Sequence, residues 1–294
     1  MPNIIKFRHD LLHDYISDAD LDELNNYSSS ESIIVKGCHF NVNGKKPIDY
    51  YNEHLDRLKK ENLTFEKIKY FKVVKYECEN IQIYFPNLEF FTCDNSHYLS
   101  EIVGLPNTLM KLSCANCCFS KLPMLSIGLI YLDCSKNKLT QLDNLPTRLK
   151  TLICTYNELS QLDYLPDSLI KLDCSRNNLI KLDNLPTGLV HLECCSNGLV
   201  QLNSLPYFLE TLQCQHNLLE KIENLPKKLT KLYCSNNLLQ CLENIPETVV
   251  SMNCSRNKIS KLENLPQNLT ELNCSENNSI YVDNLPKNLK ICRI

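Results

Sequence analysis

A repeat of 20 residues constrains this chain of 294 residues more than any other feature. From about Leu105 onward the unit L-P-x-x-L-x-x-L-x-C-x-x-N-x-L-x-x-L-x-N recurs almost without insertions. Leucine, cysteine and asparagine therefore form ladders in register along the array, with the cysteines at 114, 134, 154, 174, 194, 214, 234, 254 and 274. A fixed period of this length predicts a solenoid in which each unit packs only on its neighbours.

The sequence of each unit predicts one short strand around x-L-x-C-x, after which the chain turns back quickly to begin the next unit. Twenty residues leave little room for a helix after a strand and its turns, and the recurring proline prevents a regular helix there. We therefore expect a parallel sheet on the concave side, and extended, polyproline-like or 3-10 segments on the convex side. Leucines and ladder cysteines face inward, because no unit can bury its apolar residues alone.

The segment L-x-x-L-x-C-x-x-N-x-L, as at residues 169–179, resembles the core of the leucine-rich repeat, with cysteine in place of the third leucine. The repeat length and the Leu-Pro pair are similar to the short repeats of bacterial effector proteins. The abundance of Asn and Lys is similar to leucine-rich repeat proteins of giant amoebal viruses. The resemblance implies an α/β solenoid of the leucine-rich repeat class, with a curved sheet whose concave face meets the ligand.

The N-terminal part of the chain contains no such repeat. We expect residues 1–84 to form a small α+β cap, or an adaptor region, and residues 85–294 to form a solenoid of about ten units with a degenerate first one. Within residues 1–84 the patterns predict helices at 18–24 and 47–63 and strands at 32–42 and 70–78.

A second interpretation of the N-terminal region is an F-box-like substrate adaptor of a ubiquitin ligase. Its basis is a partial motif made of Leu12, Ile16, the Asp20-Leu21 pair and Leu24. The opening Leu-Pro and the later Trp of an F-box are missing.

The last unit is truncated, because Ile294 stands at the position of the ladder cysteine. An open strand edge of this kind predicts weak self-association through the C-terminal end.

Seventeen cysteines in a long chain without a secretory signal favour reduced thiols over a disulfide framework. The nearest approach to a zinc motif is Cys114, Cys117 and Cys118, with Cys93 one unit earlier. A single C-x-x-C is a weak zinc signal, and Cys117 stands at the asparagine position, where the repeat family also has cysteine. We therefore predict neither a metal nor a cofactor.

Charge and hydropathy exclude other classes of function. Lys and Arg number 31 against 34 Asp and Glu, a net charge of -3, which does not favour nucleic acid or an anionic membrane. No apolar run is long enough for a membrane span or a signal peptide. We expect a cytoplasmic protein, in the host cytoplasm if it is viral or an effector.

The outward positions of the predicted strands carry mixed charges, with an exception early in the array. Tyr131, Ile153 and Tyr156 fall on adjacent predicted strands and offer aromatic and aliphatic anchors inside a polar rim. Such a composition is typical of protein interfaces. The predicted partner-binding residues are Tyr131, Asp133, Ile153, Tyr156, Asp173, Arg176 and, further along, Tyr233. The leading prediction is a non-catalytic scaffold that binds a protein partner.

An enzymatic alternative centres on Cys195. His216 on the next predicted strand, with His191 and Glu193 nearby, could ionise this thiol. The predicted face is open and has no insertion that would form a pocket, so we predict no enzymatic activity.

Overall fold

The computed structural model describes residues 4–5, 32–36, 65–75, 79–277 and 280–293. The chain divides into two compact units, residues 1–138 and 139–294. Each unit is a parallel-strand β-solenoid with coils of about 20 residues, as the prediction required. Among the described residues the sole helix is the 3-10 helix η1 (Phe65–Lys67), so the α/β label is not confirmed.

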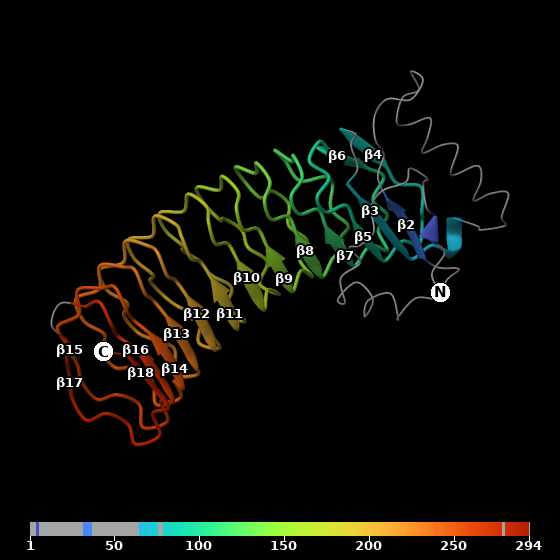
Figure 1. Cartoon of the computed structure of the whole chain (residues 1–294). Helices are drawn as coiled ribbons and strands as arrows, with labels where there is room; N and C mark the ends of the chain where they lie inside the picture. The colour runs from blue at the N-terminus through green and yellow to red at the C-terminus, as the bar shows by residue number, and fades with distance from the viewer. Residues whose placement is uncertain (1–3, 6–31, 37–64, 76–78, 278–279, 294) are drawn as a thin grey trace. The chain divides into compact units, whose positions relative to one another are not determined.

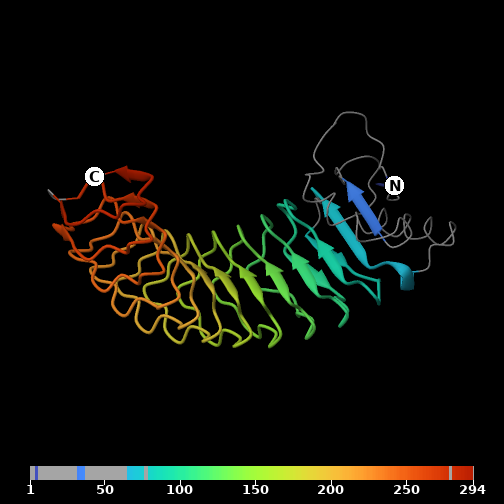
Figure 2. The same cartoon turned by 90° about the horizontal axis from the view of Figure 1, so that it is seen from below.

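In the first unit the main sheet has the strand order β1-β2-β3-β5-β7-β8. These strands are β1 (Ile4–Ile5), β2 (Ser32–Lys36), β3 (Tyr70–Val74), β5 (Phe90–Thr92), β7 (Lys111–Ser113) and β8 (Tyr131–Asp133). A smaller sheet pairs β4 (Asn80–Gln82) with β6 (Glu101–Val103). Figure 2 shows β2, in blue, beside β3, in cyan. Parallel pairing thus continues N-terminal to residue 85, whereas the boundary at 84 stays a prediction.

In the second unit one strand per coil joins a single parallel sheet, and the labelled arrows lie side by side in Figure 1. The strands are β9 (Thr151–Ile153), β10 (Lys171–Asp173), β11 (His191–Glu193), β12 (Thr211–Gln213), β13 (Lys231–Tyr233), β14 (Ser251–Asn253), β16 (Glu271–Asn273) and β18 (Ile291–Arg293). Leu172 lies opposite Leu152 and Leu192, a step of one repeat. On the return side β15 (Lys261–Leu262) pairs with β17 (Tyr281–Val282).

The apolar ladders form the core of each coil. In the coil of β10, Leu169, Leu172, Cys174 and Leu179 are fully buried. The Leu-Pro pair closes the turn before the strand, since the amide of Leu169 donates to the carbonyl of Pro166 at 3.0 Å. Proline fits this position because its carbonyl, and not an N–H, makes the bond.

The asparagine ladder connects each coil to the one before it. The side-chain amide of Asn177 donates to the carbonyls of Cys154 and Cys174, both at 3.0 Å, and its oxygen accepts from the amide of Leu159 at 3.1 Å. The same contacts recur at Asn217, Asn237 and Asn257. Each asparagine therefore satisfies buried backbone groups of two coils, which explains its recurrence.

The cysteine ladder makes bonds in the opposite direction. The thiol of Cys174 donates to the carbonyl of Glu193 in the following coil at 3.5 Å, and Cys154 and Cys194 do the same to Asp173 and Gln213. Cysteine is small enough for the crowded interior and still supplies a weak donor. All fifteen cysteines within the described residues are free thiols.

Each regular coil of the second unit reverses direction through two residues with positive φ. The first follows the ladder cysteine by two positions, as at Tyr156 and Arg176. The second lies on the return segment and is asparagine at 144, 184, 224, 244, 264 and 284, but Tyr164 and Ser204 in two coils. Asparagine tolerates this left-handed conformation better than most residues, which accounts for its frequency there.

Replacing Tyr164 with asparagine is expected to stabilise the protein. Tyr164 has φ 57° and a side chain that is 98% exposed, so the substitution relieves backbone strain and removes little packing. The expected gain in free energy of unfolding is about 0.5 kcal/mol. Urea titration measures it, with Tyr207→Asn at an exposed site as the control. A loss of stability in Tyr164→Asn would contradict the assignment of strain.

Several N-terminal predictions fall outside the described residues. The predicted helices at 18–24 and 47–63 lie there, as do the F-box-like residues Leu12, Ile16, Asp20, Leu21 and Leu24. The strand predictions at 32–42 and 70–78 are met in part by β2 and β3. No helix in the described part of the chain has the length and apolarity needed to cross a membrane.

Candidate binding surface

The outer side of each sheet presents the first and third residues of every strand. These residues, together with the left-handed residue of the turn that follows each strand, are here called the strand face. In β10 the central Leu172 is buried, whereas Lys171 and Asp173 on either side of it are half-buried. The strand face therefore carries the residues in which one coil differs from the next, while the buried positions repeat.

In the first unit, two predicted binding residues lie on β8. Tyr131 and Asp133 flank the buried Leu132, and both are half-buried. The carboxylate of Asp133 accepts the amide of Ser135 at 2.9 Å, which fixes the start of the turn. The other five predicted residues belong to the second unit, so one continuous patch across both sets stays a prediction.

In the second unit, Tyr156 and Arg176 form the most distinctive pair on the strand face. The guanidinium carbon of Arg176 lies 4.6 Å from the centroid of the Tyr156 ring, a cation–π contact. Both residues hold the left-handed position after the ladder cysteine of their coil. Tyr156 remains 45% exposed, and Ile153 at the end of β9 is half-buried. An aromatic ring and an arginine are thus held at the surface in one orientation.

Asp173 lies on the strand preceding Arg176. Burial raises the pKa of this carboxyl, and hydrogen bonds from Ser175 act against that rise. The amide of Ser175 donates to the Asp173 carboxylate at 3.1 Å. Lys171 on β10 forms an ion pair with Glu193 on the adjacent strand β11, with 3.2 Å between its Nζ and the Glu193 carboxylate. Asp173 thus helps to shape the turn and is also a partly exposed acceptor.

Tyr233 takes part in a hydrogen-bond chain that runs across three strands. Its hydroxyl lies 3.0 Å from the hydroxyl of Ser251, which in turn donates to the carboxylate of Glu271 at 2.7 Å. The chain of hydrogen bonds fixes the ring of Tyr233, which lies four coils along the solenoid from Ile153 by strand order. Sequence reasoning proposed Tyr233 as a contact residue but missed these partners.

The arrangement around Cys195 does not favour a nucleophile. Its thiol donates to the side-chain oxygen of Gln215 at 2.9 Å, and its amide donates to Ser175 at 3.1 Å. Burial raises the pKa of the Cys195 thiol, with Asp173 and Glu193 adding to the rise. A catalytic thiol needs a lowered pKa.

The cysteine at the asparagine position behaves like the asparagines. The thiol of Cys117 donates to the carbonyl of Cys93 in the preceding coil at 3.3 Å. Burial raises the pKa of Cys93 and Cys114, and the neighbouring thiols contribute. Within the described ranges no group of three or more His, Cys, Asp or Glu side chains is placed to hold a metal ion.

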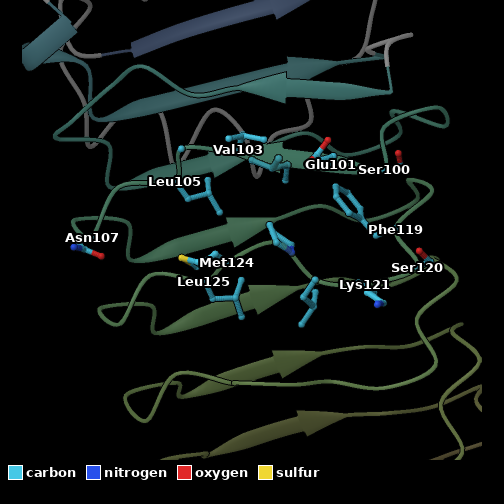
Figure 3. Close-up of a pocket in the computed structure, with 14 residues that line it drawn as sticks. Ser100, Glu101, Val103, Leu105, Asn107, Phe119, Ser120, Lys121, Met124 and Leu125 are labelled. Carbon is cyan, nitrogen blue, oxygen red and sulfur yellow. The ribbon is translucent and has the colours of Figure 1, made fainter.

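A pocket of about 700 Å³ lies on the return side of the first unit (Figure 3). Phe119, Met124 and Leu125 contribute apolar side chains to it. The ionisable residues in its lining are Glu101 and Lys121, which do not form a nucleophile–base pair. Sequence reasoning missed this pocket, where Pro123-Met124 replaces the Asp-Asn or Glu-Asn pair of most coils.

Solved structures of bacterial proteins share this architecture. YopM from Yersinia enterocolitica WA-314 superposes with a TM-score of 0.62 and 28% identity, over 78% of this chain and 60% of that one. YopM from Yersinia pestis, described as a leucine-rich effector protein, gives 0.68 and 25%, over 84% and 82%. The functional domain of InlJ from Listeria monocytogenes, which includes a cysteine ladder, gives 0.61 and 31%, over 65% and 45%.

The chain is a leucine-rich repeat solenoid. It spans 60% of the length of the Yersinia enterocolitica protein and 45% of that of InlJ. Neither protein-family models nor curated protein sequences give a match to it. The predicted resemblance to short effector-type repeats is confirmed, whereas the resemblance to proteins of giant amoebal viruses stays a prediction.

Proposed function

We propose that this leucine-rich repeat solenoid is a non-catalytic scaffold that binds a protein partner through its strand face, at the residues around Tyr156. The observation that carries the proposal is the Tyr156–Arg176 contact at 4.6 Å. Tyrosine and arginine dominate the binding energy of protein interfaces. Here they are pre-organised, so little side-chain entropy is lost when a partner binds.

Further support comes from the surroundings of this pair. Ile153 supplies an aliphatic contact beside Tyr156, and Asp173 supplies an acceptor beside Arg176. The mixed charges of the strand face give no continuous basic surface for phosphates, which favours protein over nucleic acid. A cytoplasmic location belongs to the same proposal.

Replacing both Tyr156 and Arg176 with acidic residues is expected to abolish partner binding. We expect the double variant Tyr156→Asp/Arg176→Glu to lose a partner that the intact protein retains from host-cell lysate, with at least a thirtyfold weaker affinity for the purified partner. Quantitative mass spectrometry identifies the partner, and calorimetry with the purified protein measures the affinity.

The control is Tyr207→Asp, which replaces an exposed tyrosine that precedes β12 and lies off the strand face. Urea midpoints within error of the unmodified protein establish that both variants fold. Equal retention of the partner by the double variant and the control would refute the strand face as its binding site.

A further inference from the structure

The edge of the second unit that follows the strands carries four aliphatic side chains on four consecutive coils. These are Ile180, Val200, Leu218 and Leu238, here called the aliphatic row. The first three are 62%, 53% and 50% exposed, and Leu238 is half-buried. They stand one position before or after a buried ladder leucine, so their side chains point outward. Exposed aliphatic residues that gather in one place mark a contact surface more often than isolated ones.

Gly198 makes the row continuous. A Cβ atom at Gly198 would lie 3.7 Å from Cγ2 of Ile180, so the isoleucine side chain leans over the glycine. The backbone beneath is fixed, since the amides of Gly198, Leu218 and Leu238 donate to carbonyls of the preceding coil at 2.8 to 2.9 Å. The backbone that carries the row is therefore held in place.

The spacing of successive coils is close to the pitch of an α-helix. Neighbouring parallel strands are about 4.8 Å apart, and a helix advances about 5.4 Å per turn. A helix lying along the solenoid axis would thus place one apolar residue per turn over one coil. Four coils cover roughly 14 Å, which corresponds to about three turns of helix.

Charges at the two ends of the row select one direction for such a helix. At the position of Leu218, the coil before the row carries Glu158 and the coil after it carries Lys258, both exposed. The N-terminus of a helix has partial positive charge and its C-terminus partial negative charge. The geometry points to an amphipathic α-helix of a protein partner, docked on the aliphatic row with its N-terminus near Glu158 and its C-terminus near Lys258.

The aliphatic row contains none of the residues on which the proposed function rests, so its test is independent of that function. Two displayed libraries of 14-residue peptides are selected against the full chain. One has the apolar residues at helical spacing and the other has the same composition with strict alternation. Binders are expected from the helical library alone, and fluorescence anisotropy measures their affinity.

The variants Gly198→Glu and Val200→Asp are each expected to weaken these binders at least tenfold. Gly198 has ordinary φ and room for a side chain, so Gly198→Ala serves as a folded control with little effect. Ile170→Asp, on the edge before the strands, is expected to change the affinity less than twofold. Lys258→Glu is expected to weaken binding roughly two- to fivefold at low salt and less at high salt.

The proposal would be overturned by the absence of binders from the helical library, by equal recovery from the alternating library, or by binders indifferent to both Gly198→Glu and Val200→Asp.

Discussion

Raising the pH from about 8 to about 10 is expected to unfold the protein while it is kept reduced. Burial raises the pKa of Cys93 and of eight ladder thiols above the ordinary 9.0, that of Cys234 to about 12 and that of Cys274 to about 11. In the unfolded chain the same thiols ionise near 9, so unfolding releases protons above that pH.

The sign of the effect follows from these pKa values. Stability is complete below the unfolded pKa and falls as the pH rises through the interval up to the folded pKa. Each thiol removes about 1.4 kcal/mol per pH unit within its interval, and the contributions of the ladder add. Few domains have enough stability to withstand several such contributions.

Urea midpoints at a series of pH values, measured in the presence of a phosphine reductant, test this expectation. The double variant Cys174→Ala/Cys194→Ala is expected to be less stable at neutral pH but to show a shallower decline above pH 9, because two titrating groups are missing. A midpoint that is the same at about pH 8 and about pH 10 would contradict the prediction.

Truncating one ladder asparagine is the second change with a large expected effect. In Asn177→Ala the amide of Leu159 and the carbonyls of Cys154 and Cys174 lose their side-chain partner inside the solenoid. Unpaired buried backbone groups are costly, so the free energy of unfolding is expected to fall by about 3 kcal/mol. Urea unfolding followed by far-UV circular dichroism measures the change.

Asn178→Ala is the matched control, because Asn178 is the same residue type one position later and its side chain is exposed. Its expected effect is below about 0.5 kcal/mol. Equal stability of the two variants would contradict the prediction. The ladder hydrogen bonds would then contribute nothing measurable to the free energy of unfolding, and the recurrence of asparagine would need another cause.

The coil architecture was predictable because every unit buries its apolar residues at the same repeat positions. Leu172 and Cys174 face inward in each repeat, and the 20-residue step alone places Leu192 opposite Leu172. The role of Asn177 was predictable in kind, since a buried amide has to satisfy backbone groups.

The candidate surfaces were less predictable, because they depend on the positions where the repeat varies. Tyr156 was expected at the surface, but nothing in its type indicated a left-handed backbone or the stacking of Arg176. The aliphatic row was missed because the prediction considered only the outward positions of the strands, whereas Ile180 and Leu218 lie after β10 and β12.

The direction of the asparagine ladder has a consequence for how the protein is made. Each asparagine bonds to the coil that precedes it in the sequence, as Asn217 does to Cys194 and Asn237 to Cys214. A chain leaving the ribosome exposes its earlier coils first. Each new coil can therefore pack on a preceding coil that has already folded. The solenoid can form one coil at a time before its C-terminal end is synthesised.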